Sequence, residues 1–152
     1  MAAVSLSQRE LDAGSADPAT RLKAICILNC GAGSCDAGAV AALFQRIAAE
    51  HGAACEVAAP PEGTDFTSLA RDALANGARI VVAGGGDGTI NAVASALVDS
   101  EAALGVLPLG TLNHFAKDLG IPLALEDAIR NVFAGRVQAV DVGEVNGRFF
   151  LN

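Results

Sequence analysis

The sequence contains no tryptophan and no tyrosine, and only six phenylalanines occur among its 152 residues. Small and aliphatic residues dominate instead, so that 52% of the chain is hydrophobic. This composition disfavours an aromatic-rich β-sandwich and favours tight packing of helices on a sheet. Because the length is that of one ordinary domain, we expect a single α/β unit with a sizeable core.

Basic residues are also scarce, since 10 lysines and arginines face 17 acidic residues and give a net charge of −7. A nucleic-acid-binding protein would carry basic patches, and adhesion to anionic lipid would also need positive charge. No apolar run reaches the roughly 20 residues that span a bilayer. The first residues lack the basic and apolar segments of a secretory signal. We therefore expect a cytoplasmic protein that binds no nucleic acid.

Cysteine and histidine are too few and too scattered to indicate a metal cluster. No CxxC pair occurs among the four cysteines, which are Cys26, Cys30, Cys35 and Cys55. A zinc site is therefore the weaker interpretation. In a reducing compartment we expect four free thiols that pack as small apolar side chains.

The rest of the chain alternates between strand and helix patterns. Residues 1–20 are polar and without a sustained period, so we expect a disordered tail. Short apolar runs predict strands at 22–29, 54–59, 78–83, 104–108 and 137–145. Apolar residues at helical spacing predict helices that begin near residues 40, 66, 90, 111 and 125. This order predicts a three-layer α/β/α fold with a mostly parallel sheet over residues 21–152.

Three unusual loops follow predicted strands, at residues 29–33, 84–89 and 108–113. The carboxyl ends of parallel strands meet at one edge of a sheet, which is where ligands bind in open α/β folds. Glycine lets the backbone approach a ligand closely and adopt positive φ, and the start of a helix offers unpaired N–H groups. We expect these loops to form a cradle for phosphate groups.

Asp87 lies where the glycine-rich loop 84–89 meets its helix. Its carboxylate can cap that helix or hold Mg²⁺ beside a polyphosphate. A tight turn capped by Asp87, with no ligand, explains the glycines equally well when this loop is taken alone. The loop 108–113 favours a ligand site, because Thr111 and Asn113 add polar groups beside Gly110 at a second strand end.

Two motifs at this spacing resemble a known family. The segments "GGDGT" at 85–89 and "LGVLPLGTLNHFAKDLGIP" at 104–122 are similar to the catalytic domain of the diacylglycerol kinase family, which includes sphingosine, ceramide and bacterial lipid kinases. "GGDGT" alone is shared with the NAD kinases and, in a near form, the phosphofructokinases. NAD kinases lack the "PLGTxN" segment, so an NAD kinase-like enzyme is the alternative. The resemblance implies a nucleotide-binding domain of the NAD kinase and phosphofructokinase type.

The resemblance also implies a reaction, which is ATP-dependent and Mg²⁺-assisted phosphorylation of a lipid hydroxyl. Asp87 is then the expected catalytic residue, either as a ligand of Mg²⁺ or as a base near the acceptor hydroxyl. The residues expected to bind the nucleotide are Asn29, Gly33, Gly85, Gly86, Asp87, Gly88, Thr89, Asn91, Gly110, Thr111 and Asn113.

The chain departs from the family pattern at several of these positions. The family segment "NPxSG" corresponds to residues 29–33, where its proline and serine are missing. Family members often have an acidic residue where this chain has Ala92 and His114, and a threonine where it has Pro60. The resemblance therefore implies a nucleotide site with fewer side-chain contacts.

In the family a second, β-rich domain follows, which brings acceptor-site and metal residues. This chain stops at "VNGRFFLN", where that domain would begin, so we expect it to be the N-terminal nucleotide-binding domain alone. A nucleotide-binding module without turnover is the alternative. We expect Phe149, Phe150 and Leu151 to form an exposed apolar patch that promotes self-association. Contact with a membrane surface would come through the missing domain.

Overall fold

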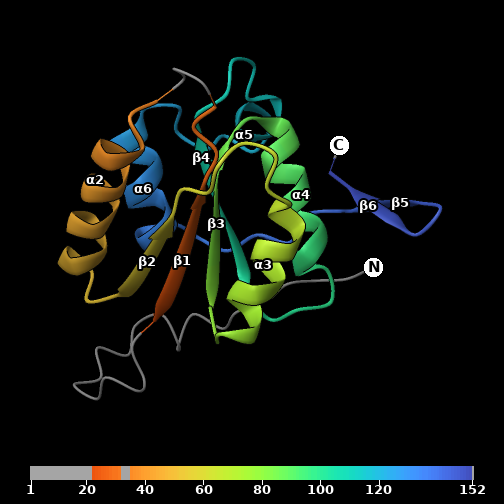
Figure 1. Ribbon diagram of the computed structural model, residues 1–152, viewed down its shortest axis with the longest axis horizontal. Coiled ribbons are helices and arrows are strands. Elements are labelled where there is room, and N and C mark those ends of the chain that lie inside the picture. Colours follow the sequence, from red (N-terminus) through yellow and green to blue (C-terminus); the bar gives the residue numbers. More distant parts are fainter. Residues whose placement is uncertain (1–21, 32–34, 152) are drawn as a thin grey trace.

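A parallel sheet of four strands forms the centre of the fold in the computed structural model (Figure 1). The structure describes residues 22–31 and 35–151, so the predicted tail at 1–20 and the predicted site residue Gly33 lie outside the described residues. The strands are ordered β2-β1-β3-β4. Their bounds are Lys23–Leu28 for β1, Ala54–Ala58 for β2, Ile80–Gly85 for β3 and Ala103–Pro108 for β4.

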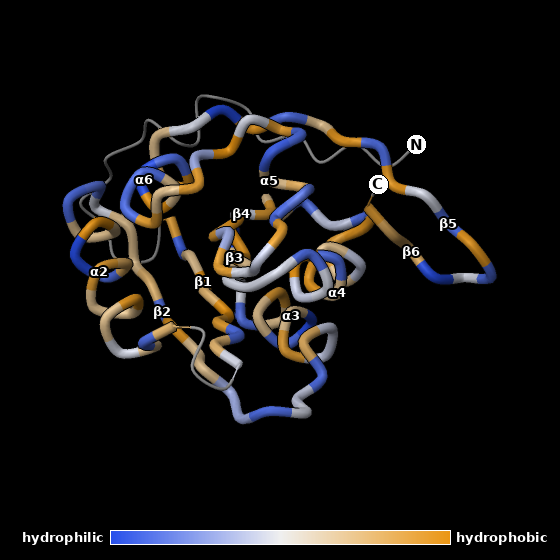
Figure 2. Tube along the Cα trace, turned by 90° about the horizontal axis from the view of Figure 1, so that it is seen from above, coloured by the Kyte–Doolittle hydropathy of each residue, from blue (hydrophilic) through white to orange (hydrophobic). Residues whose placement is uncertain are grey.

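Helices cover both faces of this sheet. On one face lie α2 (Ala37–Glu50) and α6 (Leu125–Ala134), and on the other lie α3 (Phe66–Ala75) and α4 (Asp87–Leu97) (Figures 1 and 2). The short helix α5 (His114–Asp118) follows β4. The predicted α/β class, three-layer arrangement and mostly parallel sheet are confirmed.

Successive side chains of each strand point to opposite faces of the sheet, so the core consists of two layers. In β1, Ala24, Cys26 and Leu28 pack toward α2 and α6, whereas Ile25 and Ile27 pack toward α3 and α4. Every residue of β3 is buried, as expected for a central strand with helices on both faces. The strand register places the carboxyl ends of β1, β3 and β4 at one edge, with Leu28 opposite Gly84 and Gly85 opposite Pro108.

The helix ends follow their capping residues. Asp36 and Asp65 accept hydrogen bonds from the nitrogens of Ala39 and Thr67, at 3.1 and 3.0 Å, and so cap α2 and α3. The helical stripe of Ile90, Val93, Ala94 and Leu97, predicted from the sequence, is buried in α4 as expected.

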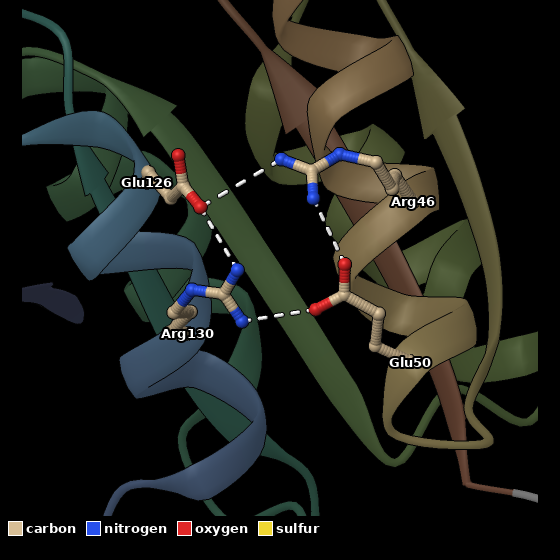
Figure 3. A network of polar contacts seen from close by, with 4 residues as sticks. All are labelled: Arg46, Glu50, Glu126 and Arg130. Carbon is tan, nitrogen blue, oxygen red and sulfur yellow. Dashed lines mark hydrogen bonds and ion pairs between the residues drawn. The ribbon is translucent and has the colours of Figure 1, made fainter.

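Four charged side chains join α2 to α6 at the surface (Figure 3). Arg130 donates to Glu50 at 2.9 Å and to Glu126 at 2.8 Å. Arg46 lies 2.9 Å from Glu50 and 3.7 Å from Glu126, which completes the network. These contacts connect helices that are far apart in sequence.

The predicted strand at 137–145 is wrong over most of its length. Residues 136–142 form no strand, and the chain ends in a separate hairpin of β5 (Gly143–Val145) and β6 (Arg148–Phe150) that projects beside α4 (Figure 1). Asn146 and Gly147 form its turn, with φ of 51° and 73°. Asn-Gly is the strongest short hairpin signal because both turn residues need positive φ, and it explains why the chain reverses here.

The prediction of four free thiols is also wrong. Cys30 and Cys35 form a disulfide between the end of β1 and the start of α2. Their Cα atoms are 5.2 Å apart, which is within the range that a disulfide bridges. Cys26 and Cys55 are free, and burial raises the pKa of both thiols. In the part of the chain that the structure describes, no helix has the length and apolar character to cross a bilayer.

Candidate functional site

The three loops predicted to form a site meet at the carboxyl edge of the sheet. The Asn29 nitrogen donates to the Gly84 oxygen at 2.7 Å, which joins the end of β1 to the end of β3. The Leu109 nitrogen donates to the Gly85 oxygen at 3.1 Å, which joins the loop after β4 to the same strand. The expectation that these loops share one edge is confirmed for the described residues.

Glycines allow the loops after β3 and β4 to touch through their backbones. A Cβ atom on Gly110 would collide with the Cα atom of Gly86 and would lie 3.1 Å from the Gly86 nitrogen. A Cβ on Gly85 would lie 2.8 Å from the side chain of Thr89. None of the described glycines at this site has positive φ, which is found instead at Gly52, Gly63, Gly77, Gly120 and Gly147. Close approach, and not a special turn, requires glycine here.

Gly86 is the N-cap residue of α4, with φ of −85° and ψ of −179°. It has no side chain, so the first turn of α4 lacks a side-chain cap. The first N–H groups of a helix carry a partial positive charge and attract anions. Gly88 in this turn is exposed, whereas Thr89 is buried.

Asp87 is the first residue of α4, yet its side chain contacts the other loop. Its Oδ2 accepts a hydrogen bond from the His114 nitrogen at 3.2 Å, and its Oδ1 accepts one from the Phe115 nitrogen at 3.1 Å. These N–H groups begin α5, whose own N-cap residue Asn113 makes no side-chain cap bond. Asp87 therefore caps α5 and not its own helix.

The side chain of Asn113 folds the loop after β4 around itself. It is buried, and its backbone has the left-handed φ of 51°. Its Oδ1 accepts from the Gly110 nitrogen at 3.0 Å, and its Nδ2 donates to the Gly110 and Pro108 oxygens at 2.7 and 3.3 Å. Asn113 thus fixes the shape of the loop, and its neighbour Thr111 is exposed.

Asn29 reaches from the end of β1 to the first turn of α4. Its Nδ2 donates to the Thr89 Oγ1 at 2.9 Å. Because the hydroxyl oxygen of Thr89 accepts this bond, its proton is free to point elsewhere and to donate. The predicted residues Asn29 and Thr89 therefore form one unit at this edge.

Asn91 lies apart from the loops and binds the C-terminal hairpin. Its Oδ1 accepts from the Leu151 nitrogen at 2.8 Å. One turn further along α4, the Ser95 hydroxyl contacts the Phe149 oxygen at 3.1 Å. The structure therefore places Asn91 at the junction of α4 with the hairpin, and the nucleotide contact predicted for it from the resemblance stays a prediction.

Sequence reasoning missed the partners that hold the loops together. They are mostly backbone groups, at Gly84, Leu109, His114 and Phe115. Every residue except proline has a backbone N–H, so the residue type does not reveal which N–H groups form these bonds. The helix predicted near residue 111 is the one feature of the sequence that indicates free N–H groups at His114 and Phe115.

The residues of this edge do not make a dedicated metal centre. Among residues 22–31 and 35–151, no group of three or more His, Cys, Asp or Glu side chains is placed to hold a metal ion. The nearby carboxylate of Asp87 has a backbone N–H bound to each of its oxygens.

An apolar cavity of about 350 Å³ lies elsewhere, between α4, β4 and α6. Its walls include Leu104, Val106, Val132 and, at one end, Phe115. The glycines of the strand-end loops do not line it. The candidate site is therefore the loop edge and not this cavity.

Known proteins that resemble this chain are kinases by description. The family described as "Diacylglycerol kinase catalytic domain" matches residues 23–145, which include the loops after β3 and β4. A "Probable lipid kinase YegS-like" from Enterobacter sp. (strain 638) is 44% identical over 96 residues, which are 60% of this chain and 32% of that protein. A protein of the same description from Pseudomonas savastanoi pv. phaseolicola is 46% identical over 93 residues, 60% of this chain and 30% of that protein.

Solved structures that are similar to this chain are also described as diacylglycerol kinases. A crystal structure of a diacylglycerol kinase from Bacillus anthracis str. Sterne superposes with a TM-score of 0.75 and 26% sequence identity. The superposition covers 86% of this chain and 46% of that chain. This chain thus spans about a third of the length of the two curated relatives and about half of the solved one.

Proposed function

Because the chain belongs to the diacylglycerol kinase catalytic-domain family, we propose that it is the nucleotide-binding part of an ATP-dependent lipid kinase. Such an enzyme transfers the γ-phosphoryl group of ATP to a hydroxyl group of a diacylglycerol-like or sphingoid lipid. Since this chain spans about a third of its curated relatives, we propose that the lipid-binding residues lie in sequence beyond the matched part.

One observation carries the nucleotide proposal: the uncapped start of α4 lies against the glycine loop after β4. A Cβ on Gly110 would collide with the Gly86 Cα atom, so the two loops are in contact through their backbones, and both residues are partly exposed. Phosphate groups bind where helix N–H groups and bare backbone are exposed together. We propose that Gly86 and Gly88 supply N–H groups, with Gly85 beside them at the end of β3 and with Gly110 and Thr111 contacting the nucleotide from the second loop.

We propose that Asn29 orients the hydroxyl group of Thr89 so that this hydroxyl acts as a hydrogen-bond donor. Asn29 donates to the Thr89 oxygen at 2.9 Å, so the hydroxyl proton is directed away from Asn29. In this arrangement the hydroxyl donates to a phosphate oxygen. Phosphoryl transfer depends mostly on positioning and on neutralising charge, which suits a site made of backbone and hydroxyl donors.

Magnesium is the cation that the family implies, and it neutralises charge on the transferred phosphoryl group when bound. Among the described residues no cluster of three ligating side chains occurs, and each oxygen of Asp87 accepts one backbone N–H and keeps a further lone pair. Mg²⁺ at kinase sites is held by one or two carboxylates together with substrate phosphates and water, so Asp87 fits the part of a single carboxylate ligand. No step of the reaction is assigned to an ion held by this chain.

The proposed location is the cytoplasm, with peripheral contact to the membrane that holds the lipid; a reducing cytoplasm keeps thiols reduced, so there we expect Cys30 and Cys35 as a thiol pair. The family match favours the lipid kinase over an NAD kinase-like enzyme, because it covers the segment "PLGTLN" as well as "GGDGT".

Calorimetric titration of the purified chain with ATP tests the nucleotide proposal. We expect saturable binding at one site, and GTP and NAD serve as comparison ligands. Absence of saturable binding would contradict the proposal.

Transfer from radiolabelled ATP to diacylglycerol or sphingosine in mixed micelles tests the lipid proposal. We expect background transfer for this chain alone and measurable transfer when the unmatched part of the Enterobacter relative is joined to it. Robust lipid phosphorylation by the chain alone would place the acceptor site within residues 1–152.

A further inference from the structure

We propose that Cys30 and Cys35 form a thiol–disulfide exchange site, and that closing their disulfide fixes the loop after β1 in the arrangement that binds ATP. The second half of this proposal rests on the proposed function, because it concerns the same nucleotide site. The structure joins the two sulfur atoms, with the Cα atoms of the two cysteines 5.2 Å apart.

The disulfide lies where a reactant in solution can reach it. Both of its cysteines are half-buried, and both pack against the core layer beneath α2 and α6. The free thiol of Cys26, in contrast, is fully buried within that layer. Partly exposed disulfides are the ones that exchange readily, whereas buried cysteines are inert. The position of the Cys30–Cys35 bond therefore suits reversible exchange.

On one side the disulfide adjoins the proposed phosphate-binding residues. Asn29 directly precedes Cys30 and donates its backbone N–H to the Gly84 oxygen at 2.7 Å. Its Nδ2 donates to the Thr89 Oγ1 at 2.9 Å, which is the contact that orients the Thr89 hydroxyl. A change of the backbone at Cys30 therefore acts on a residue that the nucleotide site uses.

On the other side the disulfide adjoins the fixed start of a helix. Cys35 directly precedes Asp36, whose Oδ1 accepts from the Ala39 nitrogen at 3.1 Å and caps α2. The buried side chains of α2 hold this helix against the sheet. Closing the disulfide thus ties Asn29 to α2. A loop that is rigid in its binding conformation gives higher affinity, because less conformational entropy is lost when the ligand binds.

The exchange needs one co-reactant, a low-molecular-weight disulfide such as oxidised glutathione. The thiolate of one cysteine attacks a sulfur of that disulfide, which forms a mixed disulfide and releases one thiolate. The thiolate of the second cysteine then attacks the protein sulfur of the mixed disulfide and releases the other thiolate. Two electrons pass from the cysteine pair to the co-reactant, and the two protons of the cysteines end on the two released thiols. In a reducing cytoplasm the pair is open, and a rise in oxidised glutathione closes it.

Thiol exchange in the absence of denaturant tests the first half of the proposal. We expect excess reduced glutathione to open the disulfide of the folded chain and oxidised glutathione to close it again, with an unchanged far-UV circular dichroism spectrum. Alkylation and mass spectrometry should find labels that depend on the redox state at Cys30 and Cys35, and an equal label at Cys55 in both forms. If the disulfide opens only in denaturant, or if its opening unfolds the chain, the bond is a structural cross-link and the proposal is wrong.

Titration of the two redox forms with ATP tests the second half. We expect the oxidised chain to bind ATP about three- to tenfold more tightly, which is the effect of ordering one side chain before the ligand arrives. The double variant Cys30→Ser, Cys35→Ser should bind like the reduced chain in both solutions. Cys55→Ser, which changes a free thiol of β2, should keep the difference between the two forms. Equal affinities of the two wild-type forms, or tighter binding by the reduced form, overturn the proposal.

A measurement without nucleotide separates this proposal from the proposed function. The backbone amide of Asn29 should exchange with solvent faster in the reduced chain, because its bond to the Gly84 oxygen is then held less firmly. The amide of Ala103, which donates to the Arg79 oxygen at the opposite end of the sheet, is the control and should not change. An unchanged Asn29 amide overturns the proposal. If neither redox form binds ATP, the proposed function fails, and the Asn29 amide then decides whether the disulfide controls this loop.

Discussion

At the scale of single residues, the contact between Gly86 and Gly110 leaves no room for a side chain on the second loop. We predict that Gly110→Ala forces the two loops apart, because its Cβ would collide with the Gly86 Cα atom. Overpacking of this kind lowers the free energy of unfolding by about 1–3 kcal/mol. Calorimetry should show a lower Tm, and titration should show weaker ATP binding.

Gly88→Ala is the matched control for this substitution. A Cβ at Gly88 would meet nothing within 4 Å, and the residue lies inside α4. Alanine is a better helix former than glycine by about 1 kcal/mol, so the Tm of this variant should be kept or raised. If Gly110→Ala kept the Tm and the ATP affinity of the wild type, the prediction would be wrong, because the loops would then separate without loss of stability or binding.

The sequence predicted which residues of the first motif gather at the sheet edge but not how they act. Close approach explains Gly85, whose Cβ would lie 2.8 Å from the Thr89 side chain, whereas Gly86 is extended and a Cβ there would meet only the Gly110 Cα atom, at 3.5 Å. The partners of Asp87 could not be predicted, because every residue except proline carries a backbone N–H. The bond from the Leu151 nitrogen to Asn91 could not be predicted for the same reason.

At the scale of elements, the charged network of Figure 3 makes the contact between α2 and α6 depend on pH. Hydrogen bonds from Arg130 hold the pKa values of Glu50 and Glu126 below their ordinary value of 4.5. A carboxylate with a depressed folded-state pKa stabilises the fold above its unfolded-state pKa, and this contribution is lost as the pH falls through the folded-state pKa.

We therefore predict that acidification below about pH 4.5 lowers the Tm more steeply in the wild type than in Arg130→Gln. The difference should be small, because both partners are exposed, and it should shrink at high salt. Arg136→Gln, which changes an exposed arginine outside the network, is the control. Parallel pH profiles for the wild type and Arg130→Gln would contradict the prediction.

The disulfide between Cys30 and Cys35 gives a second prediction at this scale. In denaturant without reductant, the chain should titrate as two thiols, from Cys26 and Cys55, and as four after reduction. Closing so short a loop stabilises a fold by on the order of 2 kcal/mol, so reductant should lower the Tm. The double variant Cys30→Ser, Cys35→Ser should show no effect of reductant on the Tm. Four thiols before reduction would contradict the disulfide.

Strands and helices were predictable where their apolar pattern was long or their caps were clear. β3 and α4 were predicted because one is apolar on both faces and the other has a regular buried stripe. The C-terminal hairpin was not predicted, because β5 and β6 have three residues each and their pattern is too short to separate from an extended strand, and its one signal in the sequence is the Asn-Gly pair at 146–147. The order of the strands in the sheet could not be predicted either, because it is set by tertiary packing and not by the residues of any one strand.

At the scale of the whole molecule, the hairpin exposes two large apolar side chains to solvent beside the charged Arg148. Val145 and Phe150 are 57% and 41% exposed, and the pairing of Gly143 with Phe150 places both side chains on one face. Exposed apolar patches of this kind favour association. We predict concentration-dependent self-association, measured by light scattering after gel filtration, and its loss in the double variant Val145→Lys, Phe150→Lys.

Leu112→Lys is the control, because Leu112 is equally exposed, at 57%, but lies in the loop after β4. A monomer at every concentration would contradict the predicted association. The expected exposed patch of Phe149, Phe150 and Leu151 is wrong for two of its members, since Phe149 is partly buried and Leu151 packs with the core around α4.

The sheet order has a consequence for how the protein is made. β1 is translated first but lies inside the sheet, where it pairs with β2 on one side and β3 on the other. During synthesis its second edge and its apolar residues stay open until β3 and α4 have left the ribosome. Parallel pairing between distant segments is slow to form and leaves such edges prone to aggregation. The nascent chain is therefore expected to need chaperone protection between the synthesis of β1 and that of α4.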